Sequence, residues 1–118
     1  MSEYLPDNWV VLKINHEGET LYKVLAGWRC VVLAGGAGWR MNSGIVSVET
    51  FGDLYGFYGF TFGDLYGFYG LSGSVYWCRQ GAYGLTMATS GIYNKLKERV
   101  GDAVELMPED TDWMAVEW

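Results

Sequence analysis

The residues best suited to chemistry are tyrosines and aspartates in a glycine-rich segment in the middle of the chain. Phenol rings offer flat faces for sugar rings or bases, and carboxylates accept hydrogen bonds from hydroxyl groups. These residue types predict a binding platform made of Asp53, Tyr55, Tyr58, Asp64, Tyr66 and Tyr69. Bases fit it less well than sugars, because no Lys or Arg lies between Arg40 and Arg79 to hold a phosphate.

Two other interpretations of this aromatic segment stay open. Eleven of the twenty aromatic residues lie between Phe51 and Trp77, and a small core does not bury all of them. Rings that cover glycines on neighbouring strands would make the segment a packing device. Rings that reach the surface would favour self-association, because contiguous apolar patches usually mark contacts. We expect a self-associating module and a homo-oligomer, with binding of a carbohydrate or another small ligand as the alternative.

An eleven-residue segment occurs twice in tandem. Residues 50–60 (TFGDLYGFYGF) and 61–71 (TFGDLYGFYGL) agree at ten of eleven positions. Side chains alternate along a strand, so a shift by eleven would exchange the two faces if one strand ran through both copies. Either a turn near residues 59–61 resets the alternation, or one copy is surplus. We expect the second: the copies compete for one place in a sheet, and one of them forms an extended outer hairpin or an exchanged arm. We expect a chain without residues 61–71 to fold.

Catalytic motifs do not occur in the chain, and we expect a protein that is not an enzyme and has no cofactor or metal. His16 is the only histidine, and it lies in an expected turn. Cys30 and Cys78 are far apart and have no metal-binding spacing, so we interpret both as structural thiols. Asp53 and Asp64 are one repeat position seen twice, which makes them a poor glycosidase pair.

The charge opposes binding to nucleic acid or to an anionic membrane. Fourteen acidic and eight basic residues give a net charge of −6, whereas both partners require a cationic surface. No basic residue follows Arg99, and the carboxylates beyond it are Asp102, Glu105, Glu109, Asp110, Asp112 and Glu117. We expect a solvated acidic tail. An acidic decoy of a nucleic-acid-binding protein is the third candidate function, with a host protein as its partner.

Targeting signals are missing from the sequence. No apolar run reaches the roughly 18–20 residues that cross a bilayer, and the first residues lack the basic start and apolar run of a signal peptide. We therefore expect a cytoplasmic protein without membrane contact.

Short alternating segments predict a mainly β, α+β fold with one short helix. Residues 1–118 would form a single domain, a small antiparallel curled sheet, barrel or sandwich of six to eight strands. The strands would come from the segments 9–14, 19–25, 28–33, 39–41, 45–51, 74–79 and 82–87, with 103–107 and 113–118 as two further candidates. The first two strands form a hairpin across the loop 15–18. Ile92, Leu96 and Val100 are spaced as on a helix, which we place at 90–100 with an N-cap at 89–91 and a stop at Gly101.

Three segments resemble small proteins encoded by tailed phages, for which no activity is established. The segments are 4–13 (YLPDNWVVLK), 39–45 (WRMNSGI) and 72–76 (SGSVY), together 22 of the 118 residues. The resemblance implies a viral or bacterial cytoplasmic origin. It implies no site residue, because none of these segments contains a catalytic motif.

Overall fold

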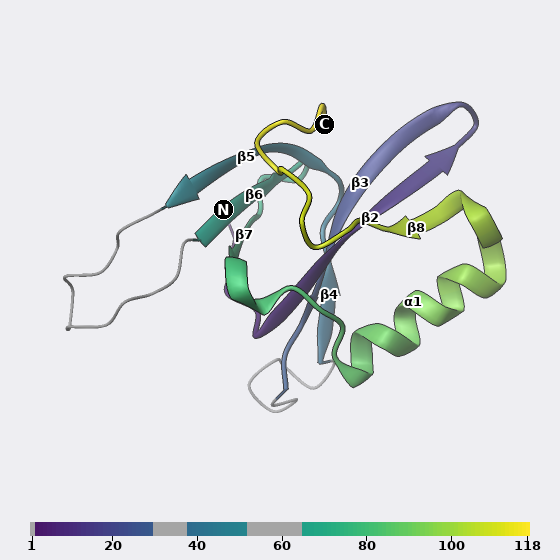
Figure 1. The fold of residues 1–118 in the computed structure, drawn as a ribbon, viewed down its shortest axis with the longest axis horizontal. Coiled ribbons are helices and arrows are strands. Elements are labelled where there is room, and N and C mark those ends of the chain that lie inside the picture. The colour runs from purple at the N-terminus through teal and green to yellow at the C-terminus, as the bar shows by residue number, and fades with distance from the viewer. Residues whose placement is uncertain (1, 30–37, 52–64) are drawn as a thin grey trace.

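The computed structural model describes residues 2–29, 38–51 and 65–118, which form two four-stranded sheets and one α-helix (Figure 1). The elements are β1 (Glu3–Tyr4), β2 (Asn8–His16), β3 (Glu19–Gly27), β4 (Trp39–Met41), β5 (Ile45–Phe51), β6 (Leu65–Gly70), β7 (Val75–Arg79), η1 (Gln80–Ala82), α1 (Met87–Val100), η2 (Gly101–Ala103) and β8 (Val104–Leu106). The mainly β class with one helix is thereby confirmed. The sheets stay open rather than closing into a barrel.

Sheet B has the strand order β4-β3-β2-β8, and all its pairs are antiparallel. Its centre is the expected hairpin of β2 and β3. Both strands are longer than predicted, since His16 still pairs with Glu19, and only Glu17 and Gly18 form the turn. These two residues have φ angles of 50° and 81°, as a tight hairpin turn that follows the strand twist requires.

Sheet A has the strand order β1-β7-β6-β5. β6 is an inner strand, antiparallel to β5 on one side and to β7 on the other. β1 pairs in parallel with β7, and Glu3 lies opposite Val75. The second copy of the repeat thus supplies β6. Of the first copy, the structure describes Thr50 and Phe51, which end β5.

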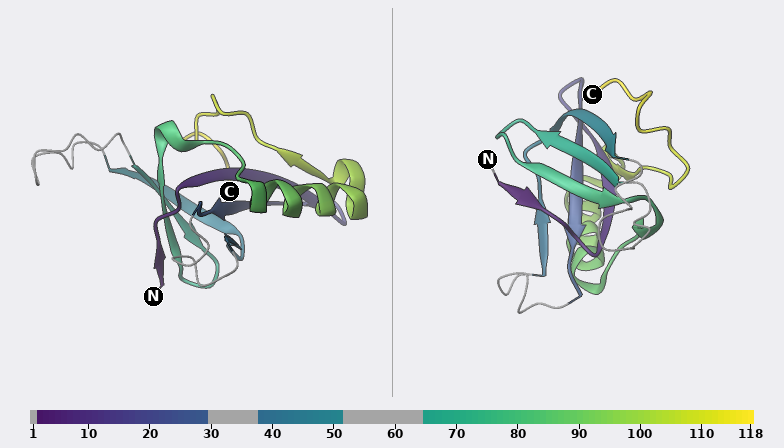
Figure 2. Two further views of the ribbon diagram at one scale, coloured as in Figure 1. Left: turned by 90° about the horizontal axis from the view of Figure 1, so that it is seen from below. Right: turned by 90° about the vertical axis from the view of Figure 1, so that its left-hand side faces the viewer.

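One face of sheet B packs against α1, which is drawn lengthwise in the left view of Figure 2. Side chains of α1 cover a cluster of buried residues, and those in contact with it are Ile92, Tyr93 and Leu96. Val100 remains 48% exposed. Gly101 ends the helix as expected, with a φ of 56° and its N–H bonded to the carbonyl of Lys97.

The start of α1 corrects the prediction for residues 82–91. The helix begins at Met87, because Thr86 and Thr89 form a capping box in which each side chain bonds the other residue's backbone N–H. The expected strand 82–87 does not form. Its only pairing is an isolated bridge between Tyr83 and Trp9.

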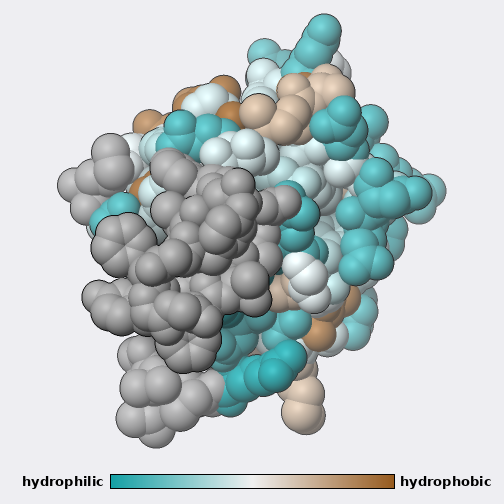
Figure 3. Space-filling model, turned by 60° about the vertical axis from the view of Figure 1, so that its left-hand side comes forward, coloured by the Kyte–Doolittle hydropathy of each residue, from teal (hydrophilic) through white to brown (hydrophobic). Residues whose placement is uncertain are grey.

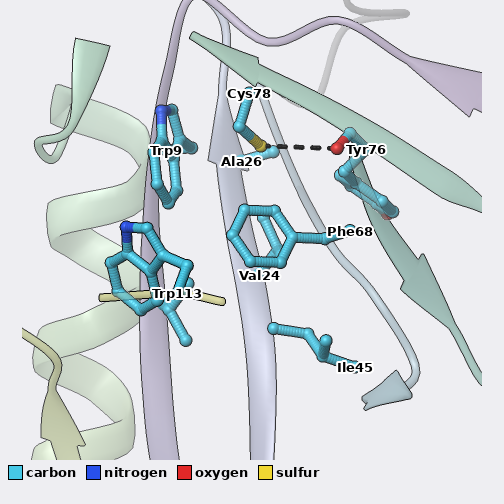
Figure 4. Packing of buried hydrophobic residues seen from close by; sticks show 9 residues of the cluster. Trp9, Val24, Ala26, Ile45, Phe68, Tyr76, Cys78 and Trp113 are labelled. Carbon is cyan, nitrogen blue, oxygen red and sulfur yellow. Dashed lines mark hydrogen bonds between the residues drawn. The ribbon is translucent and has the colours of Figure 1, made fainter. Parts of the chain in front are cut away.

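The other face of sheet B packs against the inner face of sheet A and forms the larger core (Figure 4). Sheet B contributes Trp9 and Val24, and sheet A contributes Phe68 and Tyr76. Trp9 lies at the centre of a ring cluster, with centroids 4.7–6.1 Å from its neighbours Tyr66, Phe68, Tyr83 and Trp113.

The C-terminal segment is part of this core, which corrects two expectations. Residues 113–118 form a turn and irregular chain rather than a strand, and they pair with no strand in the described part of the chain. Trp113 is only 2% exposed, and Trp118 stacks on it with centroids 6.5 Å apart. The six carboxylates of the acidic stretch are exposed. The stretch is therefore an anchored segment with a charged outer side, not a free tail.

The expected strand 28–33 falls mostly outside the described residues. Trp28 and Arg29 belong to no strand.

Candidate functional site on the outer face of sheet A

Two of the six predicted site residues lie in the described structure, and β6 carries both. They are Tyr66 and Tyr69. Asp53, Tyr55, Tyr58 and Asp64 lie outside the described residues. The structure therefore supplies geometry for the second half of the predicted platform only.

Tyr66 and Tyr69 lie on opposite faces of β6, because three positions separate them and strand side chains alternate. Tyr66 packs into the core, with its ring centroid 6.1 Å from Trp9 and 6.0 Å from Phe68. Tyr69 belongs to the face of sheet A that points away from the core, which we call the outer face. One surface therefore does not display both rings.

Tyr69 lies between a carboxylate and a second ring on the outer face. Its hydroxyl donates a hydrogen bond to the carboxylate of Glu49 on β5. Its ring meets Trp77 of β7 edge to face, with centroids 6.3 Å apart and planes at 78°. The hydrogen bond to Glu49 is the largest cause of a raised pKa of Tyr69, and desolvation and the nearby negative charges add to it.

Trp77 covers the backbone of the neighbouring strand. Gly67 lies opposite Trp77 in the register of β6 and β7. A Cβ at Gly67 would lie 2.4 Å from a carbon of the indole ring, closer than any real contact, so only glycine fits there. This pair is the ring-over-glycine packing that was one interpretation of the aromatic segment. The indole N–H also donates to Oε1 of Glu3, 3.2 Å away.

The outer face thus presents two half-buried rings, each bonded to a carboxylate. Sequence reasoning missed three of these four residues: Glu3, Glu49 and Trp77. Their positions follow from the pairing of β1, β7, β6 and β5, which brings together residues more than 70 positions apart. The chemistry that this set offers is hydrogen-bond acceptance beside apolar ring surface, which suits hydroxyl-rich or amphipathic ligands.

The Cys78 thiol and the Tyr83 hydroxyl, two reactive groups in the described part of the chain, serve the packing of the fold. Complete burial raises the pKa of the Cys78 thiol well above its usual value, which leaves it un-ionised and inert. The hydroxyl of Tyr83 accepts the N–H of Val11 and donates to the carbonyl of Met107, so it links β2 to the segment after β8. Within residues 2–29, 38–51 and 65–118, no group of three or more His, Cys, Asp or Glu side chains is arranged to hold a metal ion.

Two hollows lie away from the outer face. One, of about 500 Å³, lies beside α1 and is lined by Ile92, Lys95, Leu96, Glu98 and Arg99. The other, of about 440 Å³, lies at the start of α1 and includes Asn8, Trp28 and Thr86. Neither shares a residue with the outer face.

Exposed large apolar side chains are scattered over the described surface. They come from different elements and connections: Leu5, Val46, Leu71, Met87, Val100 and Met114. In Figure 3 the brown hydrophobic atoms likewise appear in small separate groups on the coloured part of the visible face. Among residues 2–29, 38–51 and 65–118, the exposed apolar side chains thus form no broad patch.

Among the described helices, none combines the length and apolar character that a membrane span requires.

Comparisons with known proteins do not assign the chain to a family. No protein family, no curated protein and no solved structure matches the chain.

Proposed function

We propose that this protein is a non-enzymatic interaction module that associates with copies of itself by exchanging the β6 strand. A phage or bacterial origin and a place in the cytoplasm belong to the same proposal and rest on the sequence patterns alone. A host protein is the alternative partner.

The observation that carries the proposal is the surplus of β6 sequence. β6 is Leu65–Gly70 (LYGFYG), and residues 54–59 have the same six letters. Each molecule therefore carries two segments of identical sequence for one inner position of sheet A. A strand from a second molecule meets the same β5 and β7 neighbours, with the same side chains. Exchange of identical elements is a low-cost route to dimers.

The test is light scattering after size-exclusion chromatography over a hundredfold concentration range. The wild-type chain is expected to form a dimer or a larger species. The matched control is the triple variant Tyr55→Ser, Phe57→Ser, Tyr58→Ser, which keeps the chain length and removes the apolar side chains of the surplus strand. This control and a chain lacking residues 61–71 should both be folded monomers. A wild-type chain that stays monomeric at every concentration would overturn the proposal.

Binding of a carbohydrate is the second candidate function, and the outer face of sheet A favours it. Tyr69 and Trp77 supply ring surface, and Glu49 and Glu3 supply acceptors for sugar hydroxyls. A glycan array tests this candidate directly, with Trp77→Ala as the site variant and Met87→Ala, which changes a 95% exposed side chain elsewhere, as its control. Signals that Trp77→Ala removes and Met87→Ala keeps would support it. An array without signals would exclude it for the sugars displayed.

A further inference from the structure

We propose that either copy of the repeat fills the β6 position within one molecule, so that the chain has two native registers related by a shift of eleven residues. In the first, β6 is Leu65–Gly70, as observed. In the second, residues 54–59 take its place. This inference goes beyond self-association, because it holds for a strictly monomeric protein.

Every side-chain contact of the observed β6 strand has an equivalent in the shifted register. The turn after it does not, because the N–H of Gly70 donates to the carbonyl of Ser74 and the N–H of Gly73 to the carbonyl of Gly70. Phe68 is fully buried in the core, and Phe57 is its counterpart eleven positions earlier. Gly67 lies beneath the Trp77 ring, and Gly56 has the same position in the first copy. Because all six letters agree, the two registers bury the same side chains and form the same ladder with β5 and β7.

The one position at which the copies differ lies just beyond the strand. Leu71 ends the second copy, and Phe60 ends the first. The Leu71 side chain is 65% exposed, and its main structural contact is a backbone hydrogen bond from its N–H to the carbonyl of Gly44, 2.9 Å long. Phe60 has the same backbone donor, so the difference disturbs neither the core nor the ladder.

The chain connections also permit the shift. Phe51 at the end of β5 pairs with Leu65, and residues 52–64 join them. In the shifted register Phe51 would pair with Leu54, joined by Gly52 and Asp53 alone. A two-residue link that begins with glycine suits a tight hairpin. The link to β7 would lengthen from 71–74 to 60–74. Loop-closure entropy alone differs between the two registers by roughly twofold, and the tight turn gained at 52–53 offsets the turn lost at 71–74.

Paired phenylalanine variants test this inference by thermal unfolding, at a concentration where light scattering shows a monomer. Phe57→Ala and Phe68→Ala should each lower the melting temperature by less than about 3 °C, because the register with the intact ring takes over. The double variant should lower it by about 12–20 °C, the loss expected for one buried phenylalanine in a chain of this size. If Phe68→Ala alone gives the full loss and Phe57→Ala adds nothing to it, the inference is overturned.

Hydrogen exchange of the wild-type chain, followed by mass spectrometry, gives a second and independent measurement. Two registers predict slow exchange in a fraction of molecules for residues 54–59 and in the remaining fraction for 65–70. Protection of 65–70 alone would refute them. Gly56→Val and Gly67→Val are matched controls, because a side chain at either position collides with Trp77 when that copy fills β6. Each variant should confine protection to the other copy. If light scattering shows that the chain does not self-associate, the results expected from thermal unfolding and from hydrogen exchange stay the same.

Discussion

Replacement of Trp113 by alanine tests the role of the C-terminal segment in the core. The Trp113 ring is 2% exposed and lies 5.6 Å from Trp9, 5.7 Å from Tyr83 and 6.0 Å from Phe68, centroid to centroid. It therefore joins both sheets to the segment after η1. Truncation to alanine leaves a cavity at this junction.

The expected loss follows from the size of the ring. A buried aromatic side chain removes about 150–250 Å² from water, which at about 25 cal/mol per Å² corresponds to roughly 4–6 kcal/mol. Measured changes of buried tryptophan to alanine cost about 3–5 kcal/mol. No ladder holds residues 113–118, so the segment can relax into part of the cavity. We expect Trp113→Ala to lower the free energy of unfolding by about 3–4 kcal/mol and the melting temperature by about 12–16 °C.

The assay is urea and thermal unfolding followed by far-ultraviolet circular dichroism. The control is Met114→Ala, one residue away, whose side chain is 55% exposed. The control should change the unfolding free energy by no more than about 0.5 kcal/mol. Equal stability of Trp113→Ala and Met114→Ala would refute the assignment of the segment to the core, and a free acidic tail would then be the better description.

Three further predictions concern the helix cap, the buried tyrosines and the thiol. Thr86→Ala removes the capping box of α1 and should cost about 1 kcal/mol in urea unfolding, whereas Ser90→Ala should cost less; equal losses would contradict the cap. Burial raises the pKa of Tyr76 and of Tyr83 to about 12, whereas a tyrosine of the unfolded chain has a pKa near 10. The protonated hydroxyls therefore contribute fully to the free energy of unfolding below pH 10, and this contribution is lost as the pH rises to about 12. Urea unfolding at pH 9 and pH 11.5 should show this decrease, and Tyr83→Phe should reduce it; an equal decrease in the variant would exclude Tyr83 as its source. In a Cys30→Ser background, Cys78 should react with a thiol reagent only at the rate of unfolding, and immediate reaction would disprove its burial.

Local patterns predicted those elements whose partners are near in the sequence. The alternation in residues 9–14 and 19–25 identified the hairpin of β2 and β3, and residues 45–51 match β5. The helix start was misplaced because Thr89 and Ser90 are themselves good caps. The structure uses Thr86 instead, since its side chain and that of Thr89 satisfy each other's backbone donors.

The errors fall where distant contacts decide the structure. Residues 113–118 have the composition of a strand, but a strand requires a backbone partner, and here ring packing against Trp9 and Phe68 holds the segment. The outer face depends on the parallel pair of β1 and β7, which no local pattern indicates. Glu3 therefore could not be placed beside Trp77 before the strand order was known.

Trp113 lies near the end of the chain, so the ribosome adds this core residue late in translation. The hairpin of β2 and β3 is complete once residue 27 has been made, yet the ring that covers Trp9 from the C-terminal side arrives at residue 113. At 5–20 residues per second, the ribosome needs roughly 4–17 s to make the intervening chain. Throughout that interval the apolar face of the nascent hairpin lacks its final cover, and a chaperone that binds apolar strands has time to reach it.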